Sequence, residues 1–128
     1  MEHRARIMVV QDDPVLRGLV SGSLRPEGHE IIELKSPLEA IRLAAIEYQT
    51  IDLVLTKVDC QPITGIEMAK QLVRKGIDVP VLFMLASHAL AGVMARSIGQ
   101  ASIIRQPFTG AELRASVRRC LSNHRSRG

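Results

Sequence analysis

Five short apolar runs, separated by segments with helical periodicity, constrain this chain more than any other feature of its sequence. The runs are rich in the Val, Ile and Leu residues that favour strands buried on both faces, and they cover residues 6–10, 29–34, 51–56, 79–86 and 101–105. The segments between them are long enough for one helix each but too short for a second domain. This alternation predicts a single α/β domain, in which helices cover both faces of a parallel five-stranded sheet.

Capping signals locate most of the helices between these runs. Asp13 is followed by Pro14, an order typical of an N-cap residue and the first helical position. Residues 36–39 and 109–112 each have the Ser/Thr-x-x-Glu spacing of a capping box. Together with the amphipathic segment 65–76, these signals predict four of the five helices.

The remaining helix and the end of the chain are less strongly marked. Residues 87–99 predict a weak helix that is interrupted by Gly92. We expect the last helix to end near Leu121. The domain then comprises residues 1–122, and residues 123–128 form a basic, disordered tail.

Composition excludes several other classes of protein. With 128 residues, of which 46% are hydrophobic, the chain can bury a core without disulfides or metal. No apolar run approaches the ~20 residues of a transmembrane helix, and the N-terminus lacks the features of a signal peptide. We therefore expect a cytoplasmic protein with no membrane partner, whose two isolated cysteines, Cys60 and Cys120, are reduced.

The expected functional site lies at the carboxyl ends of the strands, where the loops of an open parallel sheet form a crevice. In this chain the loops bring together residues 11–13, 56–59, 85–87 and 105–108. These segments carry acidic and basic side chains, but the sequence has no zinc-ligand spacing, glycine-rich phosphate loop or Ser-His-Asp combination. We therefore do not expect an enzyme.

Four segments around this crevice follow one another in a distinctive order. They are "VVQDDPVLR" after the first run, "DLVLTKV" followed by Gly65, "VPVLFMLA", and "RQPF". In this order and spacing they resemble the bacterial response-regulator receiver domain, the CheY-like family, over residues 5–122. The resemblance implies a flavodoxin-like (βα)5 fold with strand order 2-1-3-4-5 and a role in two-component signal transduction.

The resemblance also implies a phosphorylation pocket. In the family, a carboxylate pair after the first strand holds Mg²⁺, and an aspartate at the end of the third strand accepts a phosphoryl group from a histidine kinase. A Thr or Ser after the fourth strand and a Lys after the fifth bind the phosphoryl oxygens. Mg²⁺ and Lys are needed because the transferred group carries charge that must be neutralised.

Most of these positions are altered in this chain. The carboxylate pair falls on Gln11 and Asp12, the phosphoacceptor on Lys57, the hydroxyl on Leu85 and the lysine on Gln106. Only Asp12 keeps the chemistry that the family requires. An amine cannot form the acyl phosphate that a carboxylate forms, so the resemblance implies a receiver fold with a degenerate phosphorylation pocket.

Lys57 admits two arrangements. In the first, it pairs with Asp12 across the crevice and acts as an internal counter-ion where a metal would otherwise lie. We therefore expect no cofactor, and Asp12 is the residual candidate ligand for Mg²⁺. In the second, Lys57 extends into solvent and pairs with nothing. Asp59, two residues further along, is an alternative phosphoacceptor, although this shift moves it off the strand end.

The parts that respond to phosphate in the family are also altered. Ile103 occupies the position of the aromatic switch residue, so we do not expect a phosphate-driven conformational switch. Residues 87–99 are unusually apolar, and Leu90, Met94 and Ile98 are candidate contacts on the surface formed by the fourth helix, fifth strand and fifth helix. In the family this surface binds partners or a second copy. Alternatively, these side chains pack on the sheet.

We therefore expect a phosphorylation-independent pseudo-receiver that binds a histidine kinase, an output protein or an adaptor, or forms a homodimer. One alternative is a conventional regulator that is phosphorylated on Asp59. The other is a nucleic-acid or scaffold-binding domain, because seven arginines and a single acidic residue lie from Arg96 onward and the net charge is +4. This last alternative is the weaker one, since the final helix lacks interleaved aromatic residues and any recognition motif.

Overall fold

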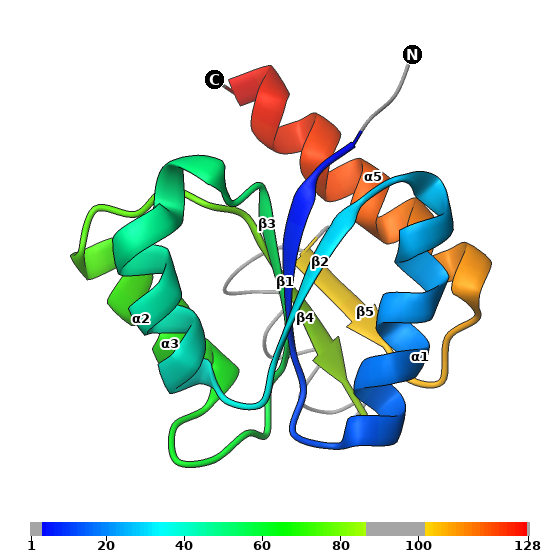
Figure 1. Ribbon diagram of the computed structural model, residues 1–128, viewed down its shortest axis with the longest axis horizontal. Coiled ribbons are helices and arrows are strands. Elements are labelled where there is room, and N and C mark those ends of the chain that lie inside the picture. The colour runs from blue at the N-terminus through cyan, green and yellow to red at the C-terminus, as the bar shows by residue number, and fades with distance from the viewer. Residues whose placement is uncertain (1–3, 87–101, 128) are drawn as a thin grey trace.

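Five parallel strands form one sheet in the order β2-β1-β3-β4-β5 (Figure 1). The computed structural model describes residues 4–86 and 102–127. Its strands are β1 (Arg6–Val10), β2 (Glu30–Leu34), β3 (Leu53–Lys57), β4 (Val81–Leu85) and β5 (Ile103–Arg105). The strand order and the parallel pairing confirm the flavodoxin-like fold predicted from the sequence.

Helices cover both faces of this sheet. They are α1 (Pro14–Leu24), α2 (Pro37–Glu47), α3 (Gly65–Arg74) and α5 (Gly110–Arg127), with short 3-10 turns η1 (Arg25–Glu27) and η2 (Tyr48–Thr50). Figure 1 shows α1 and α5 together on one face, and α2 and α3 together on the other. None of the helices in the described part of the chain is long and apolar enough to cross a membrane.

The capping signals in the sequence are confirmed. The Asp13 carboxylate accepts a hydrogen bond from the backbone N–H of Val15 at 2.9 Å, and Pro14 is the first residue of α1. The predicted capping box of α2 is present at residues 36–39. At the start of α5, the Thr109 hydroxyl and the Glu112 carboxylate each accept from the other residue's backbone N–H. These side chains satisfy backbone donors that the first helical turn leaves without partners.

The end of the chain differs from the expectation. The last helix was expected to end near Leu121 and residues 123–128 to form a disordered tail, but α5 continues to Arg127. The physical reason is that residues 122–127 contain neither Pro nor Gly and include basic residues, which are favourable near the C-terminus of a helix. The weak helix predicted over residues 87–99 lies outside the described residues.

Successive residues of β1 face opposite sides of the sheet, and both sides are buried. Ile7 and Val9 pack with apolar residues of α1 and α5, whereas Met8 and Val10 pack with apolar residues of α2 and α3. All four side chains have no solvent exposure. Burial of this kind contributes about 1.5–3 kcal/mol for each large aliphatic side chain, so β1 and its neighbours form a rigid base for the loops that follow them.

Gly65, the first residue of α3, lies unusually close to the end of β3. A Cβ atom added at this position would be 2.7 Å from the backbone oxygen of Lys57. The Gly65 backbone N–H also donates to the carbonyl of Val58 at 2.9 Å. The absence of a side chain therefore allows the loop after β3 to return tightly against the strand end.

We predict that Gly65→Ala destabilises the fold, because the new methyl group meets backbone that cannot move without shifting β3. The expected loss is about 1–3 kcal/mol in the free energy of unfolding, measured by urea denaturation with circular dichroism. Gly18→Ala in the middle of α1 is the matched control, since nothing lies within 4 Å of the added Cβ there. It should stabilise the protein by up to about 1 kcal/mol. Equal effects at the two sites would contradict the close approach.

Candidate functional site

The carboxyl ends of four neighbouring strands bring the candidate residues to one edge of the sheet. Val10 lies opposite Thr56 in the pairing of β1 with β3, so the residues that follow each of them are neighbours across the crevice. Lys57 lies opposite Met84 in the pairing of β3 with β4. The backbone N–H of Gln106, directly after β5, donates to the Leu85 carbonyl at 2.7 Å. The topology thus gathers the segments that the sequence analysis selected.

Lys57 and Asp12 form an ion pair across this crevice. The Lys57 Nζ lies 3.2 Å from Asp12 Oδ1. This contact confirms the predicted pairing and excludes the arrangement in which Lys57 extends unpaired into solvent. The side chains are 33% and 43% exposed, so water solvates both charges. A pair this exposed contributes about 0–1 kcal/mol, well below the ~3–5 kcal/mol lost when a fully buried pair is broken.

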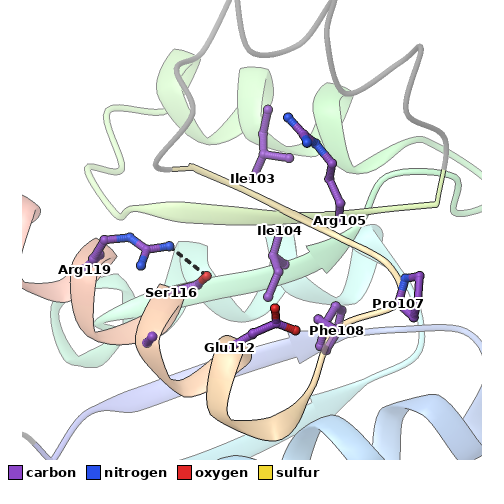
Figure 2. Close-up of a pocket in the computed structure, with 9 residues that line it drawn as sticks. Ile103, Ile104, Arg105, Pro107, Phe108, Glu112, Ser116 and Arg119 are labelled. Atoms are coloured by element: carbon purple, nitrogen blue, oxygen red, sulfur yellow. Dashed lines mark hydrogen bonds between the residues drawn. The ribbon is translucent and has the colours of Figure 1, made fainter.

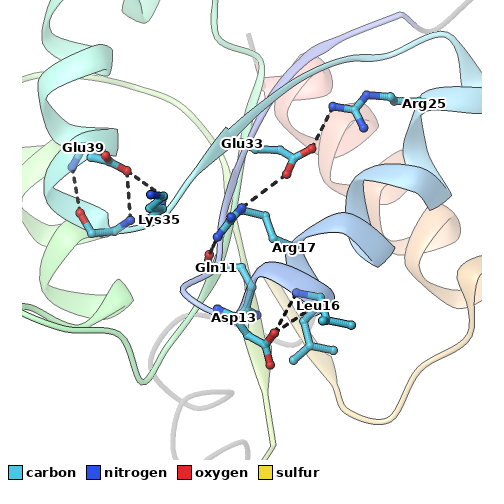
Figure 3. Close-up of polar contacts among 10 residues, drawn as sticks. Gln11, Asp13, Leu16, Arg17, Arg25, Glu33, Lys35 and Glu39 are labelled. Carbon is cyan, nitrogen blue, oxygen red and sulfur yellow. Dashed lines mark hydrogen bonds and ion pairs between the residues drawn. The ribbon is translucent and has the colours of Figure 1, made fainter.

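Gln11 is a structural residue at the edge of this crevice as well as a candidate site residue. Its side chain is 1% exposed, and its Oε1 accepts from the backbone N–H of Asp13 at 3.2 Å. Its carbonyl accepts from Arg17 Nη1 at 2.7 Å (Figure 3). The amide therefore orders the turn between β1 and α1, where a carboxylate in place of Oε1 and Nε2 would have to bury a charge.

Arg17 connects this turn to the neighbouring strand. Its guanidinium lies 3.4 Å from Glu33 on β2, and Glu33 also pairs with Arg25, as Figure 3 shows. The hydrogen bond from Arg25 holds the pKa of Glu33 below its ordinary value, with burial acting in the opposite direction. These contacts hold the start of α1 against β2 and so fix the position of Gln11.

Leu85 and Ile103 do not present their side chains with the polar residues of the crevice. Both are buried, with 2% and 8% exposure, in a separate apolar cluster that also contains Val58 and Phe83. Leu85 therefore offers only hydrocarbon where the resemblance implies a hydroxyl. Ile103 points to the side of β5 opposite Ile104 (Figure 2), so it extends the same apolar layer.

Cys60, which the sequence predicts only as an isolated reduced thiol, lies beside the charged residues of the site. Its Sγ is hydrogen-bonded to the Lys57 carbonyl at 3.4 Å, and its side chain is 1% exposed. The pKa of this thiol is raised to about 11, chiefly by burial and also by the Asp12 and Asp59 carboxylates, while Lys57 acts in the opposite direction. The charged groups of the crevice thus act on one buried sulfur. No sequence motif marks this arrangement, because it depends on how the loop after β3 folds.

The donors at this site do not fit Mg²⁺. This ion takes about six oxygen ligands in octahedral geometry, usually with one or two carboxylates from the protein. Asp12 is paired with an ammonium group, Asp13 uses its carboxylate to cap α1, and Gln11 is neutral. Within the described residues, no group of three or more His, Cys, Asp and Glu side chains is arranged to hold a metal.

Two arginines of α5 make contacts with neighbouring elements of the protein. Arg118 pairs with Glu27, and Arg114 donates to the Ser23 carbonyl at 3.3 Å. These side chains therefore hold α5 against α1 and η1. Nucleic-acid binding needs basic side chains directed toward phosphates, and these two arginines are directed toward groups of the protein instead.

Comparison with known proteins agrees with the fold. A family model for the response regulator receiver domain matches residues 7–118. The chain is 34% identical over 113 residues to the uncharacterized transcriptional regulatory protein YrkP of Bacillus subtilis, covering 88% of this chain and 47% of YrkP. It is 32% identical over 114 residues to the transcriptional regulatory protein TcrA of Mycobacterium tuberculosis, covering 88% of this chain and 44% of TcrA. The chain thus spans about half the length of these relatives.

Solved structures share the same fold. A response regulator receiver domain protein from Clostridium thermocellum superimposes with a TM-score of 0.85, covering 97% of this chain and 99% of that one. The two sequences are 18% identical, so this likeness shows the arrangement of strands and helices and nothing about the site chemistry.

We predict that the pair of Lys57 and Asp12 is weakly coupled. In a double-mutant cycle with Lys57→Met and Asp12→Asn, the coupling energy from urea denaturation should be below about 1 kcal/mol and should decrease as salt is added. The pair of Arg74 and Glu67 on α3, which is also partly exposed, provides a matched cycle of similar size. A coupling energy several times larger, or one that is insensitive to salt, would show that the pair is buried.

We predict that Cys60 resists alkylation in the folded protein. A thiol with a pKa of about 11 is almost entirely protonated near neutral pH, and only the thiolate reacts. Iodoacetamide labelling, read by peptide mass, should be slow in buffer and fast in urea. Because the folded pKa lies above the unfolded one, this group stabilises the fold at neutral pH and loses that contribution as pH rises toward 11. Rapid labelling without denaturant would contradict the burial.

Proposed function

Because the chain belongs to the response regulator receiver domain family, we propose that it is a receiver of two-component signalling that works without phosphorylation. The family assignment places it among domains that interact with histidine kinases and output proteins. The finer proposal is that this receiver binds its partner protein through its surface, with a phosphorylation pocket that no longer supports phosphoryl transfer.

The observation that carries this proposal is the ion pair between Lys57 and Asp12. By its place at the end of β3, Lys57 stands where receivers have the carboxylate that accepts the phosphoryl group. An ammonium group paired with a carboxylate at 3.2 Å is neither a nucleophile for an acyl phosphate nor a partner for Mg²⁺. It also balances the charge of Asp12, the one carboxylate left at the positions that hold Mg²⁺ in the family, so this carboxylate does not require a metal.

The other altered positions support the same conclusion. The buried Leu85 provides no hydroxyl group, and Gln106 provides no positive charge for phosphoryl oxygens. Phosphoryl transfer depends almost entirely on positioning and charge neutralisation. Losing the nucleophile, the cation and the hydroxyl together removes each part of that mechanism.

The surface beside β5 is the part that we propose for partner binding. A hollow of about 630 Å³ lies beside β5 and α5. In Figure 2, Ile104 and Phe108 lie toward α5, and the charged side chains of Arg105, Glu112 and Arg119 lie around them. An apolar centre with a charged rim is typical of transient protein interfaces. Leu90, Met94 and Ile98 lie outside the described residues, and their contribution to this surface remains a prediction.

We predict that the protein gains no phosphoryl group when incubated with acetyl phosphate and Mg²⁺, as measured by intact mass. The positive control is the variant Gln11→Asp/Lys57→Asp/Gln106→Lys, in which the carboxylates and the lysine of the family are restored. This variant should gain one phosphoryl group, because it has an acceptor carboxylate, carboxylates that can hold Mg²⁺ between them and a positive charge for the phosphoryl oxygens.

The opposite outcome has a defined interpretation. If the wild-type chain gains one phosphoryl group and Asp59→Asn abolishes the gain, the chain is a conventional regulator and the proposal fails. If the gain persists in that variant, another residue is the acceptor, and the proposal fails in the same way.

A further inference from the structure

A second cavity lies between α1 and α5, next to the crevice but distinct from the hollow in Figure 2. Its volume is about 320 Å³, near the lower end of the range for small-molecule sites. Its apolar walls come from three parts of the fold, namely Leu16 and Leu19 on α1, Met84 on β4, and Phe108 and Leu113 at the start of α5. The cavity is thus a groove between helices and a strand, open to solvent at the exposed Leu19.

None of the residues that line the cavity carries a charge. This is unusual in a chain in which 23% of residues are charged. Its main polar groups are the amides of Gln11 and Gln106, from the loops after β1 and β5. The third polar side chain, that of Ser23, already donates its hydroxyl hydrogen to the Leu19 carbonyl.

The two glutamines give the cavity its chemical character. The oxygen of the Gln11 amide accepts from the backbone of Asp13, so its NH₂ group is the donor that this residue can offer a ligand. The Gln106 amide is half-buried and provides both a donor and an acceptor. A carboxylate and an ammonium at these two positions would exclude uncharged molecules through the cost of desolvating the charges. Two amides do not carry this cost.

We propose that the cavity between α1 and α5 binds an uncharged, mainly apolar small molecule with a carboxamide-like end that hydrogen-bonds to Gln11 and Gln106. The binding itself stands on the geometry of the cavity. Its role, as the input that replaces phosphorylation, rests on the proposed function. The route to the partner surface is short, because Pro107 and Phe108 line both this cavity and the hollow beside β5.

The test uses benzamide as the probe, with benzoate and benzylamine as charged analogues of similar shape. Titration of the isotope-labelled wild-type chain, followed by amide chemical shifts, should give saturable changes at Leu16, Phe108 and Leu113. A dissociation constant on the order of 1 mM is expected for a probe of this size, with binding at least about tenfold weaker for both analogues. No saturable change, changes that lie elsewhere, or equal binding of all three compounds would overturn the proposal.

Two variants locate the site. Leu19→Arg places a cation on an exposed wall residue and should abolish benzamide binding, whereas Val73→Arg, at an equally exposed apolar residue of α3, should leave it unchanged. Gln106→Lys should reverse the preference so that benzoate binds more tightly than benzamide. An unchanged preference in Gln106→Lys, or the same loss in both arginine variants, would count against the cavity.

The outcome is separable from that of the phosphorylation assay. If benzamide binds as described and the wild-type chain also accepts a phosphoryl group, the cavity stands and the phosphorylation-independent function fails. If benzamide does not bind and no phosphoryl group is gained, the cavity proposal fails and the proposed function is retained.

Discussion

The parallel pairing of β1 with β3 is the constraint on which the rest of the site depends. Both strands are buried on both faces, and the register that sets Val10 opposite Thr56 leaves the next residues of each strand side by side. A shift of one residue would move every side chain of a strand to the other face of the sheet. Because the core forbids such a shift, the meeting of Asp12 with Lys57 follows from the packing of the sheet and does not depend on the strength of the ion pair.

The energetics of the crevice follow from how much water reaches it. Two carboxylates that are close together repel each other unless a cation lies between them. Here the Lys57 ammonium balances the charge of Asp12 directly. Gln11 is uncharged, and its buried amide accepts a hydrogen bond from the backbone of Asp13. The contact of Lys57 with Asp12 thus links the loop after β1 to the end of β3. What Lys57 supplies is charge balance, and the apolar layers beneath it supply the stability.

The parts of the structure that depend on neighbouring residues could be predicted from the sequence. The strands and the caps at Asp13 and Thr109 depend on neighbouring residues, and they were predicted correctly. The ion pair was predictable because adjacent parallel strands end at the same edge. In contrast, the environment of Cys60, the cavity between α1 and α5, and the burial of Leu85 in a separate apolar cluster depend on which side chains pack together in space. The sequence predicts a disordered tail over residues 123–128 because this segment is basic and terminal. It contains no Pro or Gly before residue 128, however, and α5 continues to Arg127.

Gln106 and Gln11 connect the two parts of this molecule, the altered crevice and the cavity beside it. In the proposed function they belong to the altered phosphorylation pocket, and that proposal does not depend on the cavity. Both residues also line a single cavity without a charged wall. The loop after Gln106 borders the surface beside β5 as well. Coupling of the cavity to the partner surface through this loop would require a ligand that binds one arrangement of the loop better than another. In an uncharged cavity, an uncharged ligand meets that requirement more readily than a phosphoryl group does.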